Sequence, residues 1–269
     1  MKIVIFTDLD GTLLNHEDYS FDDARPSLDR IKRNGIPLVI TTSKTRVEVE
    51  EIQREMDIQA PFIVENGAAV FFPLGFRGLD TSRCEISPPY AMIKLGISYG
   101  KIREFIEKTR SLFGIRSFGD LSVSQIAELA GMSLEKAAMA KEREFTEPFL
   151  LDNITDLQAF QRLALAQGMK VIKGGRFFHL VGIQQDKGRA IRIAKSLLSD
   201  NQGIPVKTIG LGDSPNDVPM LKEVDIPVLI PRPDGTYEEI NLPGLTRAIY
   251  PGSRGWHKSM EQLLDKMKF

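Results

Sequence analysis

The sequence of 269 residues contains a single cysteine, Cys84, and three histidines. One thiol excludes an intramolecular disulfide and a zinc site made from several cysteines, and the scattered histidines form no histidine-rich metal site. No apolar run approaches the ~18 residues that a membrane-spanning helix requires. The apolar stretch at the N-terminus is also too short for a secretory signal peptide, so we expect the protein in the cytoplasm.

Charge of one sign is not in excess, because the formal net charge is −1 and the isoelectric point is near 6.4. This balance gives no electrostatic reason to expect a nucleic-acid partner. The chain has no G-x-x-x-x-G-K run, so ATP hydrolysis of the P-loop type is not supported. What the sequence does contain is 42% hydrophobic and 26% charged residues. This composition is typical of a globular protein with a sizeable core and one or two domains.

Apolar strands alternate with amphipathic helices at both ends of the chain. In the N-terminal part we expect strands at residues 2–6, 36–40 and 62–64, helices at 22–33 and 45–56, and a hairpin through Asn66–Gly67 into 68–72. Near the C-terminus we expect helices at 187–198 and 256–267, a short helix ending near 223, and strands at 206–212, 226–230 and 245–250. This alternation indicates βαβ units and predicts an α/β fold with a Rossmann-like parallel-sheet core.

The middle of the chain is less regular. It has strand-like pieces at 90–95, 170–172 and 177–181, and helices for which Ser122 and Ser133 are suitable N-caps. Segments rich in proline and glycine flank it. We therefore expect an inserted α/β cap domain at 81–181, which divides the catalytic core into residues 1–80 and 182–269.

Two carboxylates, Asp8 and Asp10, stand directly after the first strand and are followed by Gly11 and Thr12. In a parallel α/β sheet, ligands bind at the carboxyl ends of the strands. Two carboxylates this close repel each other unless a cation lies between them or one holds a proton. Mg²⁺ prefers oxygen ligands of this kind. The pair therefore indicates a magnesium site in which one carboxylate attacks phosphorus and the other transfers a proton.

Two further groups stand at the starts of predicted helices. Thr42 and Ser43 follow strand 36–40, where hydroxyls and free N–H groups at a helix N-terminus can bind a phosphate. Lys187 opens helix 187–198, a position that the helix dipole disfavours for a cation. Phosphate and carboxylate charge would offset this cost, so we expect Lys187 to orient the nucleophile and to stabilise the transferring phosphoryl group.

The run Gly212–Asp217 follows another apolar strand. The glycine permits a tight turn, and Asp213 is suited to bind Mg²⁺. Asn216 and Asp217 can hold waters of the metal or orient Lys187. We count Asp217 with the metal residues and Asn216 with the residues that face the substrate.

These four motifs occur in the order and at the strand ends typical of the haloacid dehalogenase superfamily of phosphatases, which the chain resembles. The resemblance implies that Asp8 forms an aspartyl-phosphate, and that Asp10 protonates the leaving oxygen and then activates water. It implies that Thr42 and Lys187 bind the phosphoryl oxygens. It also implies that Mg²⁺ is held by Asp8, the backbone carbonyl of Asp10 and Asp213. The position of the insert resembles the subgroup with a large α/β cap, whose members mostly dephosphorylate small sugar phosphates.

Several longer runs are similar to the mannosyl-3-phosphoglycerate phosphatase family. They are Thr42–Arg46, Glu65–Ala68, Glu144–Phe149, Gly174–Leu180 and Gly252–Trp256. This resemblance implies hydrolysis of mannosyl-3-phosphoglycerate, which yields the compatible solute mannosylglycerate. The sequence leaves open a glucosyl-3-phosphoglycerate phosphatase, another sugar phosphatase of the superfamily, a phosphomutase or a non-catalytic sugar-phosphate sensor. It also leaves the oligomeric state open.

A substrate with a phosphate, a carboxylate and a sugar needs both cations and hydrogen-bonding groups. Candidates for the carboxylate are Arg143, Lys173 and Arg176, the last of which follows Gly174 and Gly175 in an expected loop. Candidates for the sugar hydroxyls are Glu144, Glu147 and His179. Near the catalytic pocket we also expect Ser43, Lys44, Asn66 and Asn216 to contact the substrate, and Arg254 to shape the glycerate end.

Overall fold

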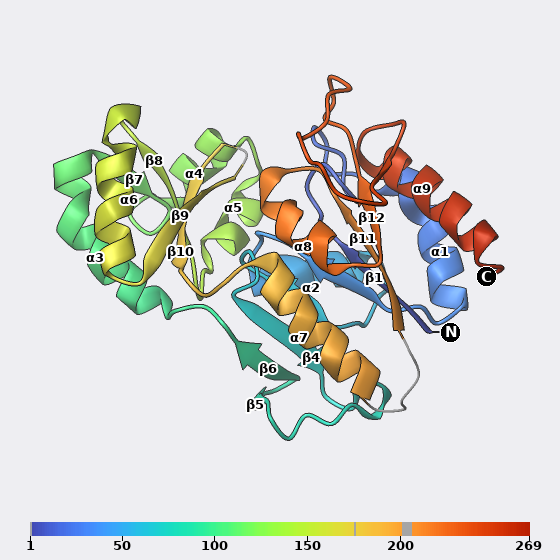
Figure 1. Ribbon diagram of the computed structural model, residues 1–269. Coiled ribbons are helices and arrows are strands. Elements are labelled where there is room, and N and C mark those ends of the chain that lie inside the picture. The colour runs from blue at the N-terminus through green and yellow to red at the C-terminus, as the bar shows by residue number, and fades with distance from the viewer. Residues whose placement is uncertain (1, 175, 201–205) are drawn as a thin grey trace.

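The computed structural model describes residues 2–174, 176–200 and 206–269. Figure 1 shows a larger part, which is built on a long sheet and contains both ends of the chain, and a smaller part formed by the middle of the chain. Gly175, one of the two glycines expected to hold Arg176 in a loop, lies outside the described residues.

The long sheet has the strand order β13-β12-β11-β1-β2-β3-β4-β6-β5. The strands from β13 to β3 in this order run parallel to one another. Beyond β3 the sheet continues with β4, β6 and β5, each paired antiparallel with its neighbour. The expected parallel-sheet core is therefore confirmed, with β1 at its centre. The strands are β1 (Lys2–Thr7), β2 (Leu38–Thr41), β3 (Phe62–Val64), β4 (Ala69–Pro73), β5 (Glu85–Ser87), β6 (Tyr90–Lys94), β11 (Val206–Gly212), β12 (Ile226–Leu229) and β13 (Thr246–Arg247).

Helices cover both faces of this sheet, because successive side chains of a strand point to opposite faces. Ile3 and Ile5 of β1 pack with α1 (Arg25–Arg33), α2 (Arg46–Glu55) and α9 (Gly252–Lys266). Val4 and Phe6 pack with α7 (Lys187–Asp200) and α8 (Val218–Glu223) on the other face. The core thus has two layers of helices around one sheet.

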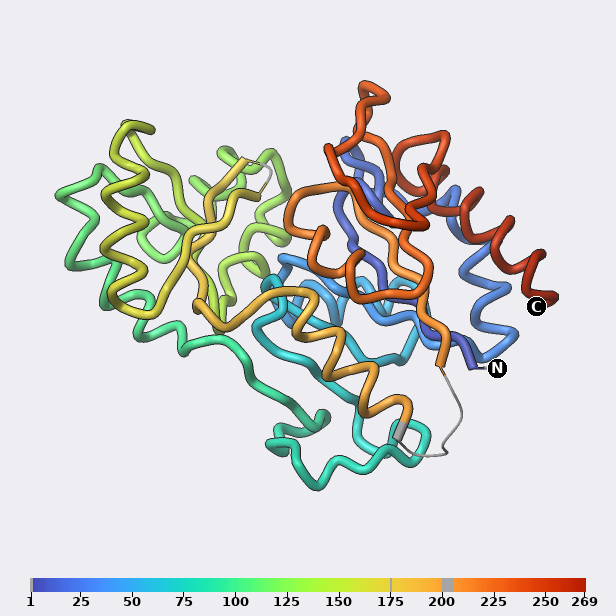
Figure 2. Tube along the Cα trace, viewed as in Figure 1, coloured from blue at the N-terminus to red at the C-terminus, as the bar shows by residue number. Residues whose placement is uncertain are grey.

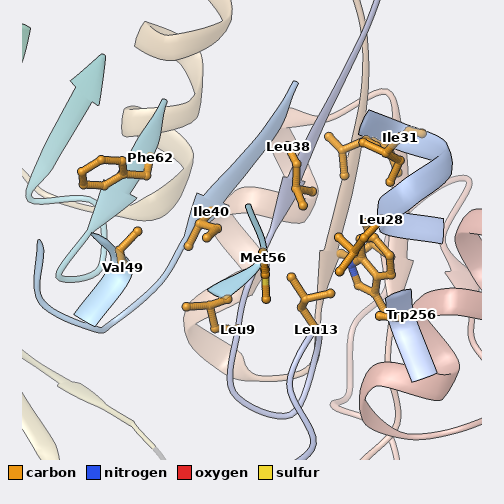
Figure 3. Close-up of a cluster of buried hydrophobic side chains, with 14 of the residues drawn as sticks. Leu9, Leu13, Leu28, Ile31, Leu38, Ile40, Val49, Met56, Phe62 and Trp256 are labelled. Atoms are coloured by element: carbon orange, nitrogen blue, oxygen red, sulfur yellow. The ribbon is translucent and has the colours of Figure 1, made fainter. Parts of the chain in front are cut away.

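Trp256, the single tryptophan of the chain, lies beside Leu28 in the layer formed by α1, α2 and α9 (Figure 3). Its side chain is fully buried, and its indole Nε1–H donates a hydrogen bond to the Thr7 hydroxyl at 3.0 Å. Thr7 ends β1 and directly precedes Asp8. Helix α9 therefore packs against the strand that leads into the first motif.

The smaller part is a four-stranded antiparallel sheet in the order β7-β8-β10-β9. Helices α3 and α6 cover one face around Phe149 and Phe160, and α4 and α5 lie toward the core, as Figure 1 shows. Ser122 and Ser133 cap α4 and α5 as expected. The elements are α3 (Tyr99–Phe113), β7 (Ile115–Ser117), α4 (Val123–Ala130), α5 (Leu134–Lys141), β8 (Glu147–Leu151), α6 (Leu157–Ala166), β9 (Met169–Lys173) and β10 (Phe178–Gly182).

The strand pairing places β5 and β6 in the core sheet, although both lie beyond the domain boundary expected at residue 81. Strands β5 and β6 extend the long sheet, because β6 pairs antiparallel along the whole edge of β4. Figure 2 shows the chain crossing to the smaller part after β6 and returning after β10. We therefore propose a cap of residues 96–182 and a core made of the two flanking segments.

The C-terminal elements also differ from expectation. The strand expected at 245–250 is limited to β13, and α9 begins at Gly252 rather than at Trp256. The first turn of α9 contains Gly252, Ser253 and Gly255, which have low helix propensity, so the sequence gives a weak signal there. A Cβ atom on Gly255 would lie 1.7 Å from the Tyr250 carbonyl oxygen, so close packing requires glycine at this position.

Within residues 2–174, 176–200 and 206–269, no helix has the length and apolar character needed to cross a bilayer.

Candidate active site

The predicted motifs meet at one edge of the long sheet. Because β11, β1 and β2 are adjacent and parallel, Asp213, Asp8 and Thr42, which follow these strands, lie side by side. This edge is the usual ligand-binding edge of an open α/β sheet.

Lys187, the first residue of α7, joins two of these motifs. Its Nζ atom donates hydrogen bonds to Asp8 Oδ1 at 2.7 Å and to Asp217 Oδ1 at 2.6 Å, and the lysine side chain is fully buried. Burial alone would lower the pKa of Lys187, but the carboxylates of Asp217 and Asp8 outweigh burial and raise the pKa above its usual value. The ammonium therefore stays charged beside Asp8.

Asp217 holds Lys187 in place. Its second oxygen, Oδ2, accepts hydrogen bonds from the backbone N–H groups of Asp213 at 3.0 Å and Ser214 at 3.1 Å. A Cβ atom on Gly212 would lie 2.5 Å from the Asp217 Cβ, so this approach requires glycine. With both oxygens engaged by protein donors, Asp217 is arranged to orient the lysine, which is one of the two roles expected for it.

Three carboxylates gather here. One oxygen from each of Asp8, Asp213 and Asp217 lies within 4.8 Å of the others. Burial and the Asp217 carboxylate raise the pKa of Asp8 to about 7, and Lys187 opposes this shift only in part. Burial, Asp217 and Asp8 likewise raise the pKa of Asp213 well above its usual value. Because Lys187 supplies one positive charge to three carboxylates, this donor set fits a hard divalent cation.

The loop after β1 shapes the same cluster. Thr12 donates its hydroxyl hydrogen to Asp213 Oδ1 at 2.9 Å. Gly11 has φ +78°, and a Cβ atom there would lie 2.7 Å from Asp213 Oδ2, so glycine is needed for conformation and for space. The two residues that follow Asp10 therefore place the Asp213 carboxylate.

Asp10 is paired with a lysine on the next strand end. Lys44 Nζ lies 2.9 Å from Asp10 Oδ1 and 3.7 Å from Glu48 Oε1. Burial works against charge on Lys44, yet Asp10 and Glu48 raise its pKa above the usual value. The Lys44 ammonium also lies 5.2 Å from the centre of the Tyr19 ring. Lys44 thus contacts the expected proton-transfer residue directly.

Thr42 is buried, and its hydroxyl oxygen accepts the backbone N–H of Lys44 at 3.2 Å. The N-cap residue of helix α2 is Thr45, which forms a reciprocal capping box with Glu48. Ser43 lines the cavity between the core edge and the cap.

A cavity lies between the core edge and the cap. Core residues on its lining include Asp8, Asp10, Ser43, Lys44, Asp213 and Asn216, and cap residues include Phe118, Arg143, Arg176, Phe177 and His179. Burial and the positive charge of Arg143 lower the pKa of His179 to about 3, so its ring is neutral near pH 7. Its Nδ1 atom has no hydrogen-bond partner within the described part of the chain. The Nδ1 atom is thus a buried polar atom whose hydrogen-bonding capacity is not satisfied by the described residues.

Other predicted residues lie away from this cavity. In β8 and β10, Pro148 pairs with His179, whereas Glu147 pairs with Leu180, so Glu147 points to the opposite face of the cap sheet. There it accepts the Gly119 N–H at 2.7 Å. Glu144 forms an ion pair with Arg46 of the core at 2.9 Å.

The remaining predicted residues occupy two other places. Lys173 and Asn66 line a second cavity, on the other side of Asn216. Asn216 bridges the two sides, because its amide donates to Asn66 Oδ1 at 3.0 Å. Arg254 is exposed in α9, with its guanidinium 3.9 Å from the centre of the Tyr250 ring.

No role was expected for Thr12 and Tyr19, which contact Asp213 and Lys44, or for Glu65, which binds the cap. Thr12 belongs to the first motif, so its position was a usable signal. Glu65 follows directly on the apolar strand β3, and an acid at that edge of the sheet was also a signal. Tyr19 has no motif that marks it, because its contacts come from distant lysines.

Comparisons with known proteins agree with this geometry. A family model described as haloacid dehalogenase-like hydrolase matches residues 5–83. Two relatives are named glucosyl-3-phosphoglycerate/mannosyl-3-phosphoglycerate phosphatase. The one from Persephonella marina is 55% identical over 99% of this chain and 98% of its own, and the one from Methanococcoides burtonii is 42% identical over the same shares. A mannosyl-3-phosphoglycerate phosphatase of Pyrococcus horikoshii is 34% identical over 82% of this chain and 88% of its own.

Solved structures share the fold over the whole chain. A protein of Thermoplasma acidophilum has a TM-score of 0.71 at 16% identity, covering 100% of this chain and 99% of its own. A haloacid dehalogenase-like hydrolase from B. subtilis has a TM-score of 0.66 at 19% identity, covering 98% of this chain and 100% of its own. The resemblance inferred from the motifs is thus confirmed. The chain belongs to the haloacid dehalogenase-like hydrolases.

Proposed function

We propose that this protein is a magnesium-dependent phosphatase that converts mannosyl-3-phosphoglycerate to mannosylglycerate and phosphate, and that it also accepts the glucosyl compound. The observation that carries the proposal is the position of Asp8, paired with Lys187 at 2.7 Å, on a cavity that cap residues share. The names of the relatives from Persephonella marina and Methanococcoides burtonii, which cover both sugars, support the substrate class.

The proposed reaction has two steps. A carboxylate oxygen of Asp8 bonds to phosphorus while the bond to the glycerate oxygen breaks, and Asp10 gives that oxygen its proton. Asp10 then removes a proton from water, whose oxygen attacks phosphorus and releases Asp8 and phosphate. Lys187 and Thr42 bind the phosphoryl oxygens, and Lys44 holds Asp10 at 2.9 Å. Mg²⁺ bound by Asp8, Asp213 and the Asp10 carbonyl would offset the negative charge of the transferring group.

The cap side of the cavity fits the rest of the substrate. Arg143 and Arg176 supply positive charge for the glycerate carboxylate. The neutral ring of His179 and the rings of Phe118 and Phe177 offer a partly apolar surface for a sugar. A substrate that reaches both Asp8 and these cap residues is bound at both ends.

The proposal is tested by initial rates of phosphate release on mannosyl-3-phosphoglycerate, glucosyl-3-phosphoglycerate, mannose-6-phosphate and 3-phosphoglycerate. We expect both glycosyl compounds to exceed the other two by about 10²-fold or more in kcat/KM, since remote binding contributes to catalysis. Similar slow rates on all four would leave a phosphatase but remove the substrate assignment. No release from any of them would remove the phosphatase assignment too.

Chelation provides a second test. Activity should be lost in EDTA and return when Mg²⁺ is added, because uncompensated carboxylates at Asp8 and Asp213 repel the phosphate. Asp213→Asn should raise the Mg²⁺ concentration for half-maximal activity by about 10-fold or more, whereas the exposed Asp23→Asn control should not. An unchanged Mg²⁺ dependence in Asp213→Asn would place the ion elsewhere.

A further inference from the structure

Glu65 is a buried acid whose surroundings are unusual. It directly follows β3, has no exposed surface and adopts a positive φ of +49°, a backbone conformation that residues other than glycine rarely adopt. Backbone strain of this kind persists only where surrounding contacts impose it. The contacts of Glu65 therefore need an explanation.

The Glu65 carboxylate binds the cap. Oε1 accepts the backbone N–H of Glu144 at 2.8 Å, and Oε2 accepts the N–H of Phe145 at 3.2 Å and the hydroxyl of Thr146 at 2.6 Å. All three donors lie in the segment between α5 and β8. A core carboxylate thus satisfies three donors of the cap away from water, where each unsatisfied donor is costly.

The turn at residues 65–68, which begins with Glu65, also binds both chain connections between core and cap. The Glu65 carbonyl oxygen accepts the side-chain amide of Gln185 at 3.0 Å, and the Gln185 Oε1 accepts the N–H of Gly182 at 3.0 Å. The Ala68 carbonyl oxygen accepts the N–H groups of Leu95 and Gly96 at 2.7 and 2.8 Å. The turn 65–68 is therefore the point at which the cap is anchored.

The anchored segment carries a cavity residue. Arg143, which directly precedes Glu144, donates from Nη1 to the Ser43 carbonyl oxygen at 2.7 Å and lines the cavity beside His179. On the core side, Asn66, which directly follows Glu65, binds Asn216. A shift of the 144–146 segment would therefore move Arg143 relative to Asp8.

We propose that Glu65 is a positioning residue that fixes the cap side of the cavity at the distance from Asp8 that a long phosphate ester requires. This inference rests on the proposed phosphatase function. It assigns a role to the contacts of Glu65 with the cap, and it separates substrates that reach the cap from those that do not.

The test compares two phosphate esters, mannosyl-3-phosphoglycerate and the small ester p-nitrophenyl phosphate. In Glu65→Gln, an amide N–H₂ replaces one acceptor oxygen, so at least one donor of the cap loses its partner. We expect kcat/KM for the long ester to fall by about 10²-fold, since a small misplacement of binding groups has effects of this size. For the small ester we expect a change of less than about threefold, because it does not use the cap contacts.

A second pair of variants guards against misfolding. Thr146→Val removes the hydroxyl that binds Oε2 but keeps the side-chain shape, and Thr146→Ser keeps the hydroxyl. We expect the valine variant to lose activity selectively on the long ester and the serine variant to stay near the native ratio of the two esters. Arg46→Gln is the matched control, because it removes a partly exposed core–cap ion pair with Glu144, and such pairs contribute little.

The ratio of the two kcat/KM values decides the outcome. An equal loss on both esters in Glu65→Gln and Thr146→Val would show a general structural role and overturn the inference, and so would native ratios in both. Failure of the native protein to hydrolyse either ester would instead overturn the proposed function.

Discussion

Replacing Asp8 by asparagine should lower phosphate release by ~10⁴-fold or more, because removal of a catalytic nucleophile has effects of this order. The substitution keeps the size of the side chain, and its amide oxygen can still accept the hydrogen bond from Lys187. We therefore expect a folded variant that binds mannosyl-3-phosphoglycerate in calorimetry and does not turn it over. Initial rates of phosphate release measure the effect.

A trapping experiment makes this test specific for covalent catalysis. Native protein quenched in acid during turnover should carry one added phosphoryl group by intact mass, and Asp8→Asn should carry none. Asp29→Asn, an exposed residue of α1, is the matched control and should behave as the native protein does. Native turnover by Asp8→Asn would refute the assigned nucleophile.

Replacing Lys187 by methionine should affect stability and activity together. The side chain is fully buried and binds Asp8 and Asp217, so its removal leaves two buried carboxylates without their cation. Breaking a buried ion pair by removing one partner lowers the free energy of unfolding by about 3–5 kcal/mol. Urea unfolding in EDTA, where no added metal compensates, measures this loss.

Phosphate release by Lys187→Met should fall by ~10³-fold, since a preorganised charge at the transferring group has an effect of this size. Lys195→Met on the same helix is the control. Its ammonium is partly exposed and lies 3.4 Å from Asp225, so we expect a change in stability within about 1 kcal/mol and native activity. If Lys187→Met were as stable and as active as this control, the assigned role of Lys187 would be wrong.

The arrangement of the catalytic motifs was predictable because it depends on local patterns. Asp8, Thr42 and Asp213 each follow an apolar strand directly, and parallel strands place such residues at one edge. The strands and helices of the core were predictable for the same reason. The order in which the strands neighbour one another could be read only from the structure. The closeness of Asp8 to Asp213 depends on that order.

The cap contacts could not be predicted in the same way. Glu147 and His179 both stand in strands of the cap, and the pairing register alone decides that His179 faces the cavity and Glu147 the opposite face. The partners of Glu65 are some 80 residues away in the sequence, at residues 144–146. A local pattern carries no information about either contact.

The position of Trp256 has a consequence for spectroscopy. Because the chain has one tryptophan, its intrinsic indole emission comes from a single place, the contact between α9 and the end of β1. The N-terminal strand and the C-terminal helix must both be in place for that indole to be shielded from water. The emission of the native protein therefore reports whether the two core segments, which are separated in the sequence, are packed together next to Asp8. No introduced label is needed.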